Sequence, residues 1–136
     1  RINGDIPPEK LTDKHLQAEY YEIVRIPNAI RGTIVDLKRI PKEFRLGTGH
    51  VIYFYDKLKF LHKRFLALKA EMSNRGFQNN LDDSMFKGLP SHLYNDIESL
   101  PRDEILERIL ERVKDKKIKY YSVDFSYEDY KKILCG

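Results

Sequence analysis

The spacing of apolar residues near the start of the chain predicts an amphipathic helix. Thr12 is placed as a helix N-cap, after an Ile6-Pro7-Pro8 segment that cannot be helical. Apolar residues then recur at helical spacing and form one stripe: Leu16, Tyr20, Ile23 and Pro27. We expect Pro27 to kink or interrupt this helix and Gly32 to lie near its end.

A longer apolar stripe predicts a second helix from about His50 to Arg75. Its members share one helical face: Phe54, Leu58, Leu61, Phe65, Leu68 and Met72. Gly76 follows as an expected C-terminal cap. At ~1.5 Å per residue, an unbroken helix of this length would be a rod of roughly 39 Å.

A third helix is predicted to begin at Pro101, with Ile105, Ile109 and Val113 as its core face. Residues 36–48 and 77–98 are polar and interrupted by Gly and Pro, which predicts two long loops. No alternation is long enough to predict a strand. We therefore expect an all-α fold: a single compact domain over residues 1–136, with three main helices, long loops and an N-terminal segment packed against the helices.

Composition narrows the class of protein. The chain is 41% apolar and 34% charged, which is typical of a folded domain. Its apolar runs are too short to span a membrane, and no segment has the layout of a signal peptide. Its one cysteine, Cys135, cannot form an internal disulfide, and no Cys/His spacing predicts a zinc site. We expect an intracellular protein that needs no metal and no organic cofactor.

The charge balance is compatible with a polyanionic partner. The chain has 25 basic and 21 acidic residues, a net charge of +4. Clustering is more informative than the total. One group of basic residues lies in the second predicted helix (Lys57, Lys59, Lys63, Arg64 and Lys69), and another follows the third (Lys114, Lys116, Lys117 and Lys119).

The first predicted helix has a polar face that could carry a site. On a helical wheel, Lys14, Ala18, Tyr21 and Arg25 lie opposite the apolar stripe, with His15 and Glu22 beside them. Ala18 leaves a gap among longer side chains, which suits a binding site. An ordinary solvated helix face is the alternative interpretation, and His15 alone is more often a capping or hydrogen-bonding residue.

Three segments resemble a known family. They are Arg1-Ile2-Asn3, then His15-Leu-Gln-Ala-Glu-Tyr-Tyr-Glu-Ile-Val-Arg25, and then Leu46-Gly-Thr-Gly-His-Val-Ile-Tyr-Phe-Tyr-Asp-Lys57 with Phe60-Leu-His-Lys-Arg64. Together they resemble the phage-type pyrimidine-dimer DNA glycosylases, the endonuclease V family that excises ultraviolet photoproducts. The resemblance is dense over residues 1–77, thin over 78–104, and returns from Arg108 to Tyr121.

The resemblance implies a metal-independent DNA N-glycosylase with abasic-site lyase activity on cyclobutane pyrimidine dimers. Its nucleophile would be an N-terminal α-amine, that of Arg1 or of a residue preceding it. Such an amine titrates near ~8, and a neighbouring guanidinium would lower its pKa further. Glu22 falls on the family's essential carboxylate. It would stabilise positive charge on the sugar and then help to remove the 2′ proton in β-elimination.

The same resemblance predicts which residues contact DNA. They are Arg1, Lys14, His15, Tyr21, Arg25, Arg108, Arg112, Lys119 and Tyr120. Two departures stand out. The family's mature chains begin with threonine immediately before Arg-Ile-Asn, and Tyr21 replaces an arginine. Tyrosine can stack on a base or bond a phosphate but cannot supply the charge. Arg108 and Arg112 could instead pair with Glu104 and Glu111, and His50 has an expected structural role as a cap or core hydrogen-bonder.

The expected partner is double-stranded DNA containing ultraviolet photoproducts, bound by a monomer with no membrane association. If the source is viral, the protein would act in the cytoplasm of the infected cell. Three alternatives stay open. The chain could recognise damaged DNA with lost or altered catalysis, it could remove another modified base, or it could be a purely structural helical domain.

Overall fold

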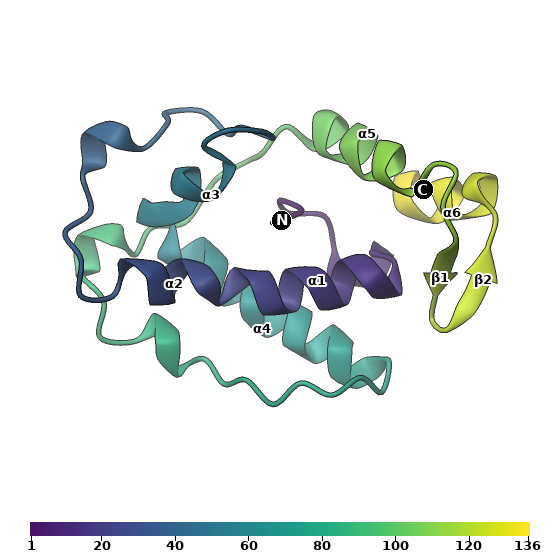
Figure 1. Ribbon diagram of the computed structural model, residues 1–136, viewed down its shortest axis with the longest axis horizontal. Helices are drawn as coiled ribbons and strands as arrows, with labels where there is room; N and C mark the ends of the chain where they lie inside the picture. The colour runs from purple at the N-terminus through teal and green to yellow at the C-terminus, as the bar shows by residue number, and fades with distance from the viewer.

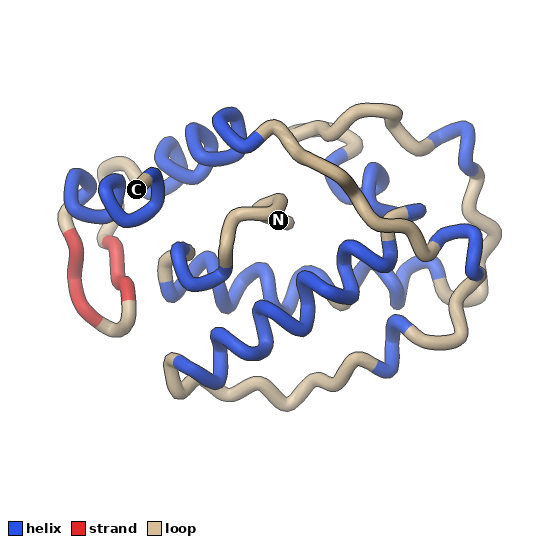
Figure 2. Tube along the Cα trace, turned by 180° about the vertical axis from the view of Figure 1, so that it is seen from behind, coloured by secondary structure: helices blue, strands red, loops and turns tan.

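The computed structural model describes residues 1–136, and a helix through the middle of the molecule organises it (Figure 1). This helix is α1 (Asp13–Ile23), which α2 (Arg25–Ile30) continues. Helix α4 (Leu58–Asn74) packs along α1 and makes the most extensive contact between two helices. The N-terminus lies near the centre, between α1 and α5 (Arg102–Val113), and it has the same place when seen from behind (Figure 2).

Helix α1 begins where the sequence predicts, and the predicted interruption near Pro27 divides the expected helix into α1 and α2, which ends at Ile30, close to Gly32. The Thr12 side chain accepts a hydrogen bond from the His15 backbone N–H, so Thr12 is the N-cap. The predicted apolar stripe is buried throughout. The helix is interrupted at Val24, because Pro27 has no N–H to donate to the Ile23 carbonyl.

The second predicted helix is not one rod, which corrects the sequence-based expectation. The structure has a short α3 (His50–Tyr53), a 3-10 turn η3 (Phe54–Asp56), and then α4. The backbone leaves the helix at Lys57, with φ −125° and ψ 43°. Asn95, from the long loop, stabilises this break. Its side chain donates to the Asp56 carbonyl at 2.9 Å, and its own carbonyl accepts from the Phe60 N–H at 3.2 Å.

The fold is not all-α, and its elements exceed three main helices. After α5, strands β1 (Ile118–Tyr120) and β2 (Val123–Phe125) form an antiparallel hairpin, and α6 (Tyr127–Cys135) ends the chain. The hairpin lies at one end of the molecule (Figures 1 and 2). Its strands have three residues each, too short to give a visible period in the sequence.

The hairpin turn is bound to the start of α1. Tyr121 and Ser122 form the two-residue turn with positive φ values of 52° and 64°, a conformation that non-glycine residues rarely adopt. The Asp13 carboxylate accepts from both of their backbone N–H groups, at 3.0 and 2.8 Å. Asp13 also pairs with Arg75 at 2.9 Å, so the end of α4 is held at the same point.

The remaining chain covers the helices with loops. Residues 31–49 contain only the 3-10 turn η2 (Leu37–Arg39), and residues 77–98 contain η4 (Ser84–Phe86) and η5 (Ser91–Leu93). Gly76, with φ 77°, ends α4 as predicted, since its N–H and that of Phe77 bond back to the Ser73 and Met72 carbonyls. No helix is both long and apolar enough to cross a bilayer.

A buried ion pair joins α1, α4 and the N-terminal segment. Glu19 is fully buried, and Arg64 donates to it through Nε at 2.7 Å and Nη2 at 3.0 Å. A third guanidinium nitrogen donates to the Ile6 carbonyl. Glu19 also accepts from the backbone and side-chain nitrogens of Asn3, at 3.0 and 2.8 Å. Every charge in this cluster therefore has a partner, which buried charges require.

Replacing Arg64 with methionine tests this cluster. Because Glu19 would keep its buried charge and lose its cation, we expect Arg64→Met to lower the free energy of unfolding by about 3–5 kcal/mol in chemical denaturation. Lys63→Met is the matched control, since the Lys63 side chain is 62% exposed and pairs only with Asp96 at the surface. Its effect should stay within about 1 kcal/mol. Equal losses in the two variants would contradict a special role for the buried pair.

Candidate active site and nucleic-acid interface

Each of the first three residues forms a hydrogen bond with a different part of the fold. The Arg1 guanidinium donates to the Leu46 carbonyl at 2.9 Å. The Ile2 backbone N–H donates to His50 Nε2 at 3.2 Å, and the Asn3 N–H donates to Glu19. The Ile2 side chain is buried in the core. The start of the chain is therefore an ordered part of the protein.

This anchoring brings the terminal residue next to Glu22. Arg1 and Glu22 together line two adjacent hollows. The floor of one is apolar and includes Ile2, Ile26 and Ala29, and the other is bounded by Gly47, Gly49 and Ile52. Glu22 is half-buried on α1, one turn beyond Glu19. Two consecutive turns of α1 therefore carry Glu19, which binds the N-terminal segment, and Glu22, which lies beside Arg1.

The environment of the terminal amine favours its neutral form. Burial lowers the pKa of the Arg1 α-amine below its ordinary value, and the charges of Arg112 and of Arg1 itself act in the same direction. The carboxylates of Glu22 and Glu19 oppose this effect without cancelling it. A neutral α-amine next to a carboxylate is suited to nucleophilic attack on an electrophilic carbon.

Arg25 lies at the open edge of this site. It contacts Glu22 at 3.3 Å, one turn away on the same face, while its own side chain is 75% exposed. An ion pair this exposed contributes little to stability. The guanidinium is therefore free to exchange Glu22 for an anionic ligand at small cost.

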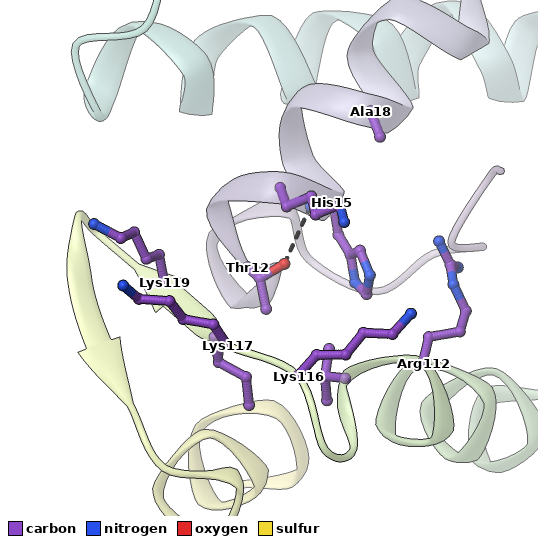
Figure 3. A pocket seen from close by; sticks show the side chains of 10 residues that line it. Thr12, His15, Ala18, Arg112, Lys116, Lys117 and Lys119 are labelled. Atoms are coloured by element: carbon purple, nitrogen blue, oxygen red, sulfur yellow. Dashed lines mark hydrogen bonds between the residues drawn. The ribbon is translucent and has the colours of Figure 1, made fainter.

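A second, strongly basic pocket lies at the other end of the same α1 face (Figure 3). It is bounded by α1, the end of α5 and strand β1. Its charged lining residues are Lys14, Arg112, Lys116, Lys117 and Lys119, and no acidic residue lines it. In Figure 3 the His15 ring points down from α1 between Arg112 and Lys116. The concentration of positive charge is suited to a phosphate group.

His15 contributes an unusual group to the basic pocket. Burial, helped by Arg112 and Lys14, lowers the pKa of His15 to about 4, so the ring is neutral at physiological pH. Its Nδ1 is buried and has no hydrogen-bond partner in the protein. Buried polar atoms normally have a hydrogen-bond partner, so this nitrogen is an exception in the fold.

The other residues expected to contact DNA lie outside these pockets. Tyr21 is exposed on α1 and packs edge-on against buried Tyr20. Arg108 lies in a separate hollow with Glu104, Glu107 and Glu111. Tyr120 donates to the Glu9 carbonyl and lies under the Arg75 guanidinium, so it helps to hold the hairpin in place. The structure thus brings Lys14, His15, Arg112 and Lys119 together, and places Arg1, Glu22 and Arg25 in a second group.

Sequence reasoning assigned no site role to Glu19, Lys116 or Lys117, and it gave His50 the role of a cap or core hydrogen-bonder, which its buried hydrogen bonds confirm. Glu19 lies at the edge of the apolar stripe on the helical wheel, and an acid there was a usable signal of a buried carboxylate. Lys116 and Lys117 were noticed only as part of a basic run. The contact of His50 with Ile2 had no local signal, because it depends on how the loop before α3 returns to the N-terminus.

The site contains no arrangement typical of a protein metal centre. No group of three or more His, Cys, Asp or Glu side chains is placed to share an ion. His62, the one histidine paired with a carboxylate, binds Asp83 and Tyr94 and connects α4 to the long loop.

A family comparison covers the first part of this site. The family described as pyrimidine dimer DNA glycosylase matches residues 4–85, more than half of the chain. The matched stretch contains His15, Glu19, Glu22 and Arg25 on the α1–α2 face, together with His50 and Arg64. The substrate implied by this match is DNA that contains pyrimidine dimers. The chain belongs to the pyrimidine dimer DNA glycosylase family.

Proposed function

We propose that this DNA glycosylase acts through an imine formed by its N-terminal α-amine, with Glu22 as the catalytic carboxylate. The amine is that of Arg1, or of a residue preceding Arg1 in the mature chain. The observation that carries the proposal is that Arg1 and Glu22 line the same two hollows while burial lowers the pKa of the amine.

The proposed first step is displacement of the base. The amine lone pair forms a bond to C1′ of the 5′ sugar of the dimer, and the glycosidic bond breaks with its electron pair leaving on the base. Positive charge that develops on the sugar lies next to the Glu22 carboxylate, which stabilises it electrostatically. Loss of an amine proton and opening of the ring then give the imine.

The proposed second step is strand cleavage. The imine acidifies the hydrogen on C2′, and Glu22 accepts that proton. The electron pair moves to form a C2′–C3′ double bond and expels the 3′ phosphate oxygen. One imine thus supports both the glycosylase step and the abasic-site lyase step, and these steps use only the amine and the carboxylate.

The basic pocket supports a proposal about how DNA is held. His15 and Glu22 are seven residues apart on α1, roughly 10 Å along the helix axis, a length equal to the rise of about three base pairs along the axis of a DNA duplex. We propose that a monomer binds duplex DNA with a backbone phosphate of the damaged region in the basic pocket and the reacting sugar at Glu22. Arg25 and Tyr21 lie between or beside these positions, where they would contact the DNA at the lesion.

Borohydride trapping tests the imine directly. A duplex with a single thymine dimer is incubated with the protein in EDTA, with and without sodium borohydride, and any adduct is mapped by peptide mass. The proposal expects a covalent adduct through the N-terminal residue and, without borohydride, a nicked strand. Tight lesion binding with neither adduct nor nick would instead support a damage-recognition protein without catalysis. Activity confined to another damaged base would contradict the choice of lesion.

Glu22→Gln separates catalysis from binding. The substitution keeps the side chain's size and removes its charge, so we expect lesion affinity to change less than about threefold while base release slows by about 10²-fold or more. Single-turnover assays on the dimer duplex measure the rate. Glu98→Gln, which removes an exposed carboxylate from the long loop, should leave both quantities unchanged. Base release at the wild-type rate in Glu22→Gln would exclude Glu22 as the catalytic carboxylate.

A pair of lysine variants tests the basic pocket. Lys116 lines the pocket and Lys114, two residues earlier, does not. If Lys116 neutralises one phosphate, Lys116→Ala should reduce the slope of log affinity against log salt concentration by about 0.9, whereas Lys114→Ala should leave it near the wild-type value. Titrations of fluorescent duplex at several salt concentrations give both slopes. Identical slopes in the two variants would place the DNA phosphates elsewhere.

A further inference from the structure

The N-terminal segment has one contact whose chemistry depends on a specific protonation state. The backbone N–H of Ile2 donates to His50 Nε2 at 3.2 Å, so this ring nitrogen carries no proton. On the other side of the ring, Nδ1 lies 2.7 Å from the Arg45 carbonyl, which can only accept. His50 is therefore neutral, with its proton on Nδ1.

The ring is held firmly in this orientation. His50 is buried and is the first residue of α3, directly after Gly49 in the left-handed conformation with φ 86°. Phe44 and Phe54 meet its ring edge-to-face, with centroids 5.3 and 5.6 Å away. A rotation that broke one hydrogen bond would break the other and disturb both aromatic contacts.

We infer that His50 is a positioning residue for the reaction, whose neutral ring fixes the Ile2 peptide so that the reacting amine, at Arg1 or at a residue before it, is held beside Glu22. This inference rests on the proposed function. Arg1 has one other contact, between its exposed guanidinium and Leu46, and Asn3 is held one residue further from the end. The Ile2 N–H is thus the first backbone group after Arg1 that a hydrogen bond holds in place.

The charges around His50 keep its ring able to accept this bond. Burial is the largest influence and lowers the pKa of His50. The Arg1 guanidinium and the terminal amine lower it further, while the Arg45 carbonyl and the more distant Glu19 act in the opposite direction. The aromatic side chains of Phe44 and Phe54 that pack against the ring carry no charge.

Two amides can replace the two ring nitrogens separately. The end of a glutamine side chain reaches the position of Nε2, so His50→Gln can still accept from Ile2. An asparagine side chain reaches only the position of Nδ1, so His50→Asn can still donate to Arg45 but leaves the Ile2 N–H without its acceptor. The variants therefore form a matched pair, in which each retains one of the two native hydrogen bonds of the His50 side chain.

The test compares the rate of borohydride-trapped adduct formation under single-turnover conditions at saturating dimer duplex. A displacement of about 1 Å in a reacting group can slow a reaction by ~10²-fold. We expect His50→Asn to slow trapping by about 10- to 100-fold and His50→Gln by no more than about threefold. Lesion affinity should change less than about threefold in both. Equal slowing in the two variants, in step with any loss of thermal stability, would reduce His50 to a packing role and overturn the inference.

Nuclear magnetic resonance of the wild-type protein gives a readout that does not depend on activity or on the folding of a variant. The nitrogen shifts of His50 should show a protonated Nδ1 and a bare Nε2, and the Ile2 amide should exchange slowly with solvent. The opposite tautomer, or rapid exchange at Ile2, would overturn the inference. If wild-type protein forms no adduct, the proposed function fails. If wild type and His50→Asn trap equally fast, only the positioning role fails.

Discussion

The buried carboxylate of Glu19 is the interaction on which the rest of the structure depends. Burying a charge away from water costs free energy unless the charge is fully paired. Glu19 is paired by the guanidinium of Arg64 and by the two nitrogens of Asn3. These partners come from α4 and from the N-terminal segment. Satisfying one charge therefore fixes the packing of α1 on α4 and, at the same time, the course of the first residues.

This constraint also orders the N-terminal segment. Terminal residues are normally mobile, since few contacts repay the entropy lost on ordering them. Here, Ile2 contributes an apolar side chain to the core, and Asn3 completes the coordination of a buried charge. Residues next to the amine are thus ordered for reasons of stability. Glu22, the carboxylate proposed for catalysis, lies one turn later on the same helix.

Helix α1 divides its two faces between folding and function. One side buries Leu16, Tyr20 and Ile23 against α4, and the opposite side presents the basic pocket at one end and the Glu22 site at the other. The hairpin that supplies Lys119 is held at its turn by Asp13, the first residue of α1. A single rigid helix therefore sets the spacing between the pocket proposed for a phosphate and the proposed reaction centre.

Features of the fold that depend on residues close together in the sequence were predicted correctly. The Thr12 cap, the interruption near Pro27 and the buried stripes follow from neighbouring residues. The break at Lys57 could not be predicted from neighbouring residues, because Phe54, Leu58 and Leu61 are buried on both sides of the break. Asn95, far along the chain, stabilises the break.

The C-terminal hairpin escaped prediction for a similar reason. Its turn conformation depends on Asp13, more than a hundred residues earlier. In the candidate site, the resemblance singled out Glu22, Arg25 and His15, whose roles stay predictions, and gave His50 a structural role that its buried hydrogen bonds confirm. The contacts of Glu19 and His50 with the first residues could not be predicted, because they depend on the three-dimensional path of the N-terminal segment.

The most direct measurement is a crystal structure of the borohydride-reduced complex between this protein and a duplex containing one thymine dimer. The account predicts a covalent bond from C1′ of the 5′ sugar to the N-terminal nitrogen, with the Glu22 carboxylate beside that sugar. It also predicts that Asn3 is still bonded to Glu19. A bond to a lysine of the basic pocket, or an N-terminal segment withdrawn from Glu19, would contradict it.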